Sequence, residues 1–141
     1  MRLTGWILGF CLSALIAACQ TASSPSIAPF TTDGCSDFPD GTPVHKNLWH
    51  KCCTAHDLKY WAGGSYDERL NADLELRACV ESAGEPAIAG LMLAGVRVGG
   101  SPWWPSSFRW GYGWPYTHGY KVLTADELEQ VRKQKEGQSL N

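Results

Sequence analysis

The stretch from Cys52 to Tyr60 combines side chains that can carry out chemistry with side chains that can form cross-links. If this stretch is α-helical, Cys52, His56 and Tyr60 recur every four residues on one face, and Cys53 and Asp57 form a stripe beside them. An imidazole is suited to proton transfer near neutral pH, and a carboxylate can bind a hard cation such as Ca²⁺. The pattern therefore predicts one helix that carries both a reactive site and disulfide bonds.

Short-range signals place a second helix directly after the first one. The first helix is expected over about 45–61 and should stop at Gly63-Gly64, because glycine can adopt a left-handed C-terminal cap. Ser65 and Glu68 have the spacing of a capping box, so a second helix should begin there and continue to about residue 82. The link between the two helices is very short.

An aspartate interrupts the apolar face of this second helix. A carboxylate that faces a core needs a hydrogen-bond donor, so Asp73 is expected to find one in a histidine of the neighbouring helix. A disulfide that brings Cys79 level with Cys52 would set the helices antiparallel and bring Asp73 to within about one turn of His56. The alternative is that Asp73 is solvated at the edge of its helix.

The N-terminus has the pattern of an exported lipoprotein. A positive charge at Arg2 precedes an apolar run that ends at Cys19, which resembles the lipobox of bacterial lipoproteins. Residues 1–18 are expected to be removed as a signal peptide, Cys19 to carry the lipid, and residues 19–32 to form a flexible tether. An ordinary signal peptide, with Cys19 as a bystander, is the alternative.

The cysteines that remain for the folded domain are Cys35, Cys52, Cys53 and Cys79. In a small exported domain they predict two disulfides. Cys52 and Cys53 point apart on a helix and will not pair with each other, so two connectivities stay open. A zinc site made from Cys52, Cys53, His50 and His56 is the alternative, although adjacent thiols are not the usual zinc spacing. The formal net charge of −2 does not favour a nucleic-acid partner.

The expected fold is mainly α, with two antiparallel helices, a packed third helix, a loop rich in Trp, Gly and Pro, and a C-terminal helix. The apolar run over about 85–96 is expected to form a buried core helix, and Thr124 should start a polar helix that reaches about residue 135. Between them, the segment 102–120 either wraps a small core with its rings or forms a lipid-facing rim. The loop 33–41 is either a surface turn or a cation loop.

The pattern Cys52-Cys53-x-x-His56-Asp57-x-x-Tyr60 resembles the CCxxHDxxY motif of the secreted phospholipase A2 family, and the chain looks most like its compact prokaryotic members. In that family a second helix supplies an aspartate to the histidine and, six residues later, a cysteine. Asp73 and Cys79 have this spacing. The resemblance covers about 33–79 and implies disulfides Cys35–Cys53 and Cys52–Cys79. The loop before the helix departs from the family's glycine-rich pattern.

The resemblance implies calcium-dependent hydrolysis of the sn-2 ester of phospholipids at a membrane surface of the bacterial envelope. His56 would act as the general base, Asp73 would orient it, and Tyr60 would add a supporting hydrogen bond. The Ca²⁺ ligands that the resemblance implies are the Asp57 carboxylate and carbonyl oxygens near Gly34, Ser36 and Phe38.

A second function stays open, because a fold does not guarantee an activity. The chain could be a catalytically inactive, phospholipase-like lipoprotein that binds lipid or a protein partner through its aromatic segment. In both cases we expect a phospholipase-like domain over 33–120 and a C-terminal helix and tail over 121–141. The mature protein is expected to be lipid-anchored, in the outer membrane and facing the periplasm.

Overall fold

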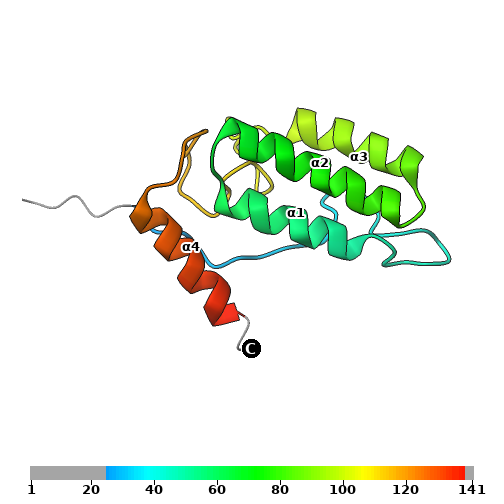
Figure 1. The fold of residues 1–141 in the computed structure, drawn as a ribbon, viewed down its shortest axis with the longest axis horizontal. Helices are drawn as coiled ribbons and strands as arrows, with labels where there is room; N and C mark the ends of the chain where they lie inside the picture. The colour runs from blue at the N-terminus through cyan, green and yellow to red at the C-terminus, as the bar shows by residue number, and fades with distance from the viewer. Residues whose placement is uncertain (1–24, 139–141) are drawn as a thin grey trace, which may run out of the picture.

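The computed structural model describes residues 25–138 and contains four α-helices and no strand within that range. The helices are α1 (His50–Ala62), α2 (Tyr66–Ser82), α3 (Pro86–Gly99) and α4 (Ala125–Gln138). Figure 1 shows α1, α2 and α3 side by side, with α2 between the other two, while α4 projects from one end. The mainly α architecture predicted from the sequence is confirmed. The expected signal peptide and Cys19 lie outside the described residues.

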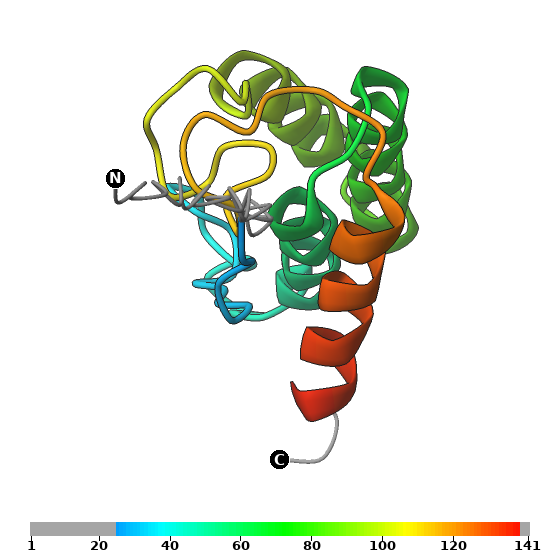
Figure 2. The ribbon, with the colours of Figure 1, turned by 90° about the vertical axis from the view of Figure 1, so that its left-hand side faces the viewer.

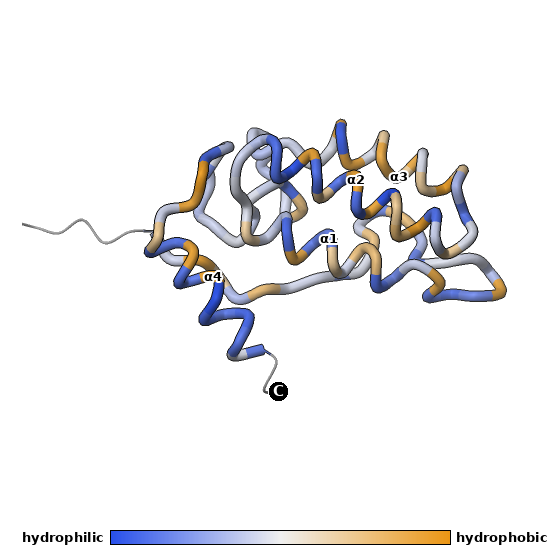
Figure 3. Tube along the Cα trace, in the orientation of Figure 1, coloured by the Kyte–Doolittle hydropathy of each residue, from blue (hydrophilic) through white to orange (hydrophobic). Residues whose placement is uncertain are grey.

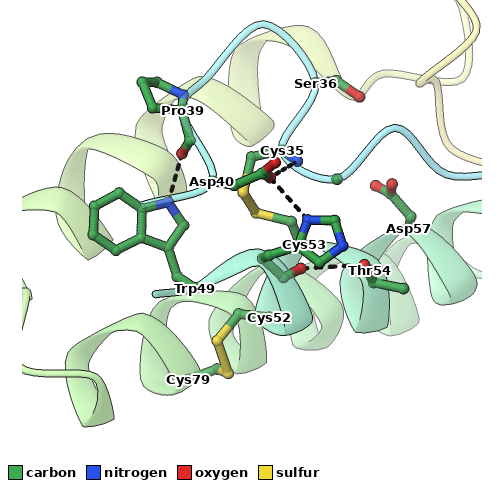
Figure 4. The surroundings of a disulfide bond; sticks show 12 residues. Cys35, Ser36, Pro39, Asp40, Trp49, Cys52, Cys53, Thr54, Asp57 and Cys79 are labelled. Atoms are coloured by element: carbon green, nitrogen blue, oxygen red, sulfur yellow. Dashed lines mark hydrogen bonds and ion pairs between the residues drawn. A yellow bond between two sulfur atoms is a disulfide. The ribbon is translucent and has the colours of Figure 1, made fainter. Parts of the chain in front are cut away.

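Two disulfides fasten α1 to its neighbours. Cys35 of the preceding loop is bonded to Cys53, and Cys52 is bonded to Cys79 of α2, with Cα–Cα distances of 5.0 and 5.7 Å (Figure 4). This is the pairing that the resemblance implies. Because both α1 thiols are consumed in disulfides, the zinc alternative is wrong. Three of these four sulfur-bearing residues belong to the main buried cluster, which also contains Leu76 and Val80.

We predict that the Cys52–Cys79 disulfide is a large contributor to stability. Its removal in a Cys52→Ala/Cys79→Ala double variant should lower the free energy of unfolding by about 3–4 kcal/mol, since the bond closes a long loop in the unfolded chain. For a domain of this size that corresponds to a melting temperature lower by roughly 10–25 °C. Thermal unfolding followed by circular dichroism measures the shift. An unchanged melting temperature would contradict the prediction.

The start of α1 differs from the expectation of a helix over 45–61. The helix begins at His50, because the backbone N–H of Trp49 donates to Asp40 O at 3.0 Å and its indole donates to Pro39 O at 2.6 Å. Residues 45–49 instead form turns that are tied to the loop before them. The loop therefore sits directly on the first turn of α1, as Figure 4 shows.

The predicted capping boxes are both present. The Ser65 hydroxyl accepts from Glu68 N, and the Glu68 carboxylate accepts from Ser65 N, at the start of α2. Thr124 and Glu127 make the same reciprocal pair at the start of α4. These short-range contacts satisfy N–H groups that the first helical turn leaves without intrahelical partners.

The third helix is not buried on all sides, contrary to the sequence-based expectation. Within α3 only Ala89 and Met92 are buried, whereas Leu91 and Val98 are 58% and 76% exposed. The reason is the arrangement of the helices: α3 lies at the outer edge and packs mainly against α2, with a smaller contact to Tyr60 of α1. Figure 3 shows this apolar outer helix, in contrast to the hydrophilic α4.

The rings of the aromatic segment 102–120 form a buried group and an exposed group. Trp110 and Trp114 are buried, and their indole N–H groups donate to Gly64 O and Ala62 O at the end of α1. The backbone N–H groups of Gly111 and Gly113 donate to Tyr60 O and Trp61 O. The segment therefore supplies the hydrogen bonds that the C-terminal carbonyls of α1 lack within the helix. Trp103, Trp104, Phe108 and Tyr116 remain exposed.

The expectation of a flexible tether is wrong for residues 25–32. Ile27 is buried in a cluster with Trp61, Trp114 and Val131 of α4. Its neighbour Ala28 accepts from the Trp61 indole at 2.8 Å. Figure 2 shows this N-terminal segment, in blue, beside the aromatic segment, in yellow to orange. The folded body thus includes residues well before the expected boundary at 33.

Candidate active site

A buried histidine and aspartate face each other between α1 and α2. The distance between His56 Nε2 and Asp73 Oδ1 is 3.0 Å, and the exposed fractions of the two residues are 7% and 0%. With Nε2 directed at the carboxylate, Nδ1 is the ring nitrogen that can accept a proton. The antiparallel helices and the Cys52–Cys79 bond bring the pair together, as the sequence predicted, and the alternative of a solvated Asp73 is wrong.

Tyr60 is a second partner of the Asp73 carboxylate. Its hydroxyl donates to Asp73 Oδ1 at 2.7 Å, and its ring lies against His56 with a centroid separation of 4.1 Å. Burial and the neighbouring carboxylate raise the pKa of Tyr60, so the phenol stays a donor. The C-terminal end of α3 approaches closely, since a Cβ on Gly100 would lie 2.5 Å from the Tyr60 hydroxyl. Only glycine fits at that position.

Two arginines that the sequence analysis missed extend this network. Arg97 of α3 places its Nε atom 2.9 Å from Asp73 Oδ2, as a charge pair whose geometry is not that of a hydrogen bond. Arg69 of α2 is buried and donates to the Tyr60 hydroxyl at 3.0 Å and to the carbonyls of Val96 and Arg97. Arg69 lies four residues before Asp73 on the same helix face, which is the signal that could have identified it. The buried Asp73 charge is therefore compensated from α3 as well as from α1.

A cavity of about 460 Å³ opens beside this pair. His56 and Asp57 contribute polar atoms to its wall, and most of the remaining wall is apolar. Small residues of α3 leave the space, and Met92, Val96 and Phe108 border it. The cavity is thus largely apolar and leads to the imidazole, so it suits the apolar part of a ligand.

The predicted calcium-loop residues reach the same cavity. Gly34, Ser36 and Phe38 line it together with Asp57. The Ser36 hydroxyl donates to Asp33 Oδ1 at 2.7 Å, so that side chain is held within the loop. Figure 4 shows the Asp57 carboxylate pointing toward the loop and the Ser36 side chain pointing away from α1.

Asp40 and His50 fix the loop against α1. Asp40 Oδ1 accepts from Cys35 N at 2.9 Å and lies 3.2 Å from His50 Nδ1. The hydrogen bond from Cys35 lowers the pKa of Asp40, and His50 acts in the same direction. Gly34 has a φ of +81°, and a Cβ there would meet Asp40 at 2.4 Å. The loop conformation therefore depends on this glycine.

The surroundings of Asp57 fit a hard cation. Burial raises the pKa of its carboxyl to about 6, and the nearby carboxylates of Asp33 and Asp40 act in the same direction. The ionised carboxylate is therefore poorly compensated in the protein alone, and a divalent ion would relieve this cost. No group of three or more His, Cys, Asp or Glu side chains that could hold a metal occurs within residues 25–138. A calcium site here would need backbone oxygens in addition to Asp57.

Comparisons of the chain with protein-family models, with curated proteins and with solved structures found no match. The geometry of the site and the motif over Cys52–Tyr60 are the features that indicate a function for this chain.

Proposed function

We propose that this protein hydrolyses the sn-2 ester of phospholipids in a calcium-dependent reaction, with His56 as the general base. The observation that carries the proposal is the buried His56–Asp73 pair, whose imidazole lines an apolar cavity together with the half-buried carboxylate of Asp57. A proton acceptor, an apolar channel and a cation ligand are the three elements that the hydrolysis of a lipid ester needs.

His56, Asp73 and Asp57 would each have a separate role in this reaction. His56 Nδ1 takes a proton from water as the water oxygen attacks the ester carbonyl, and the imidazolium returns that proton to the departing lysophospholipid oxygen. Asp73, held by Tyr60 and Arg97, keeps the ring oriented and stabilises its charged form. Asp57, with loop carbonyl oxygens, would hold Ca²⁺, which supplies positive charge for the developing oxyanion. The products are a fatty acid and a lysophospholipid.

Fatty-acid release from mixed micelles of anionic and zwitterionic phospholipids, with different labels at sn-1 and sn-2, tests this proposal. We expect release of the sn-2 label in the presence of Ca²⁺ and its loss when the ion is chelated. Release of the sn-1 label alone, or equal release with and without the ion, would overturn the proposed reaction. An absence of release under every condition would favour the second candidate function below.

The exposed aromatic rings favour a second candidate, a phospholipase-like scaffold that binds lipid without turnover. Trp103 and Trp104 are 59% and 57% exposed, and Phe108 lies partly exposed at the border of the cavity. Trp and Tyr rings favour the headgroup region of a bilayer. No helix within the described residues is long and apolar enough to span a membrane. Attachment would then depend on these rings and on the proposed lipid at Cys19.

We predict that Trp103 and Trp104 contribute to vesicle binding. In a Cys19→Ser background, which cannot carry the lipid, a Trp103→Ser/Trp104→Ser variant should bind phospholipid vesicles at least about tenfold more weakly, because two interfacial indoles are lost. Sedimentation with vesicles measures the partitioning. A Val44→Ser/Val122→Ser variant is the matched control, since both of these exposed valines lie outside the aromatic segment. Equal loss in the two variants would contradict a specific role for the tryptophans.

We also propose that the protein belongs to the cell envelope, anchored through Cys19 in the outer membrane and facing the periplasm, because its N-terminal sequence resembles that of bacterial lipoproteins. Mass spectrometry of the mature N-terminus tests it directly. A first residue other than Cys19, or a cysteine without acyl chains, would overturn the anchor.

A further inference from the structure

A single hydroxyl joins the two parts of the proposed cation site. Thr32 Oγ1 donates to Asp57 Oδ2 at 2.6 Å and accepts from Gly34 N at 3.1 Å. Asp57 belongs to α1, whereas Gly34 belongs to the loop whose carbonyl oxygens would complete the site. Thr32 itself lies in the segment 25–32, which the sequence analysis expected to be a flexible tether. Nothing in the local sequence indicated this contact.

The segment that carries Thr32 is built into the fold. The backbone N–H of Ala28 donates to Gly113 O at 2.7 Å, and the Tyr112 hydroxyl donates to Thr31 O at 2.6 Å, directly before Thr32. On the other side, Gln130 of α4 accepts from Ile27 N at 3.1 Å. The aromatic segment and α4 thus fix the backbone on which the Thr32 hydroxyl is presented.

We propose that Thr32 is a positioning residue for the cation site, which holds the Asp57 carboxylate and the loop 33–41 in the relative arrangement that a divalent ion needs. This inference rests on the proposed function. By donating to Asp57 Oδ2, the hydroxyl selects one orientation of the carboxylate and leaves Oδ1 available to bind the ion. By accepting from Gly34 N, it fixes the loop backbone relative to that carboxylate.

Hydrogen bonds of this kind are energetically significant because a metal ligand that is already oriented loses less conformational entropy when the ion binds. Partners that orient metal ligands typically change metal affinity by about 10–100-fold when they are removed. The Thr32 contact lies at the solvent edge of the site, which favours the lower end of that range. Valine has nearly the shape of threonine but lacks the hydroxyl, whereas serine keeps the hydroxyl, so the two substitutions separate shape from hydrogen bonding.

Isothermal titration of the purified full-length protein with CaCl₂ tests the proposal without any measurement of turnover. We expect Thr32→Val to raise the dissociation constant for Ca²⁺ about tenfold. Thr32→Ser should stay within about twofold of the wild type, because its hydroxyl can make the same two bonds. Thr31→Val is the matched control, since Thr31 contributes its backbone carbonyl rather than its side chain. Circular dichroism confirms that each variant is folded.

The outcomes separate this inference from the proposed function. Equal Ca²⁺ affinity in the wild type and in folded Thr32→Val overturns the role of Thr32 and leaves the proposed function standing. A loss of similar size in Thr31→Val, or no rescue by Thr32→Ser, also overturns it, because the effect would then be one of segment packing. A wild type that binds no Ca²⁺ overturns both proposals. Weaker binding in folded Thr32→Val, with Thr32→Ser and Thr31→Val close to the wild type, supports the inference.

Discussion

A His56→Gln variant is expected to lose phospholipid hydrolysis by about 10²–10⁴-fold, because a positioned general base contributes a factor of that size. Glutamine can still donate to Asp73 but cannot accept the proton of water. The fold should persist, since both disulfides and the Asp73–Arg97 charge pair are untouched. Release of labelled fatty acid, measured at saturating Ca²⁺, gives the loss in turnover.

The matched control for this variant is His45→Gln, because His45 is exposed and does not line the cavity. It should hydrolyse phospholipid at the wild-type rate. A folded His56→Gln protein that matches the control in turnover would refute the mechanism. Equal loss in both variants would point to a general effect of the substitution rather than to a general base.

An Asp57→Asn variant is expected to show the largest effect on Ca²⁺ binding, because it removes the one side-chain carboxylate assigned to the ion. The loss in affinity should exceed the roughly 10–100-fold that removal of an orienting partner costs. Titration with CaCl₂ measures it. An Asp37→Asn variant is the control, because Asp37 belongs to the same loop and cavity but is exposed and is not among the proposed ligands. Equal losses in the two variants would contradict a specific role for Asp57.

The pH dependence follows from the raised pKa of Asp57, about 6, which burial causes. Only the ionised carboxylate binds the cation, so apparent Ca²⁺ affinity should be full above pH 6 and fall about tenfold per unit well below it.

The stability of the ion-free protein should change with pH in the opposite direction. A carboxyl with a raised folded-state pKa destabilises the fold as pH rises from about 4 to 6, and Ca²⁺ should raise the melting temperature more at pH 7 than at pH 5. A Ca²⁺ affinity that does not change between pH 5 and pH 7 would contradict this assignment.

The sequence by itself determined the features that depend on short spacings. Capping residues at Ser65 and Thr124 located the starts of α2 and α4, because an N-terminal cap acts within one turn. The spacing of Cys52, His56 and Asp57 put the reactive groups on one helix. The spacing of Asp73 and Cys79 then placed the aspartate opposite the histidine, as soon as a disulfide set the register of the two helices.

Only the tertiary structure decided the features that depend on distant partners. The start of α1 shifted to His50 because Asp40 and Pro39 take the hydrogen bonds of Trp49. One face of α3 is exposed because the helix lies at the outer edge and packs mainly against α2, and apolar composition does not reveal how many neighbours a helix has. The half-buried Arg97 and the edge hydroxyl of Thr32 carry no local pattern either.

Residues 25–32, compared with the helix caps, show why contacts with distant partners could not be predicted from the sequence. An uncharged segment rich in Ser, Thr, Ala and Pro cannot bury a core by itself, so its composition favours a tether. In the folded chain Ile27 is nevertheless buried, because it packs against Trp61, Trp114 and Val131. Those partners lie far along the chain, and hydrophobic burial has no direction or spacing that a local pattern could record. The packing of this segment, and with it the contact between Thr32 and Asp57, is therefore fixed by the assembled surface and not by the segment's own residues.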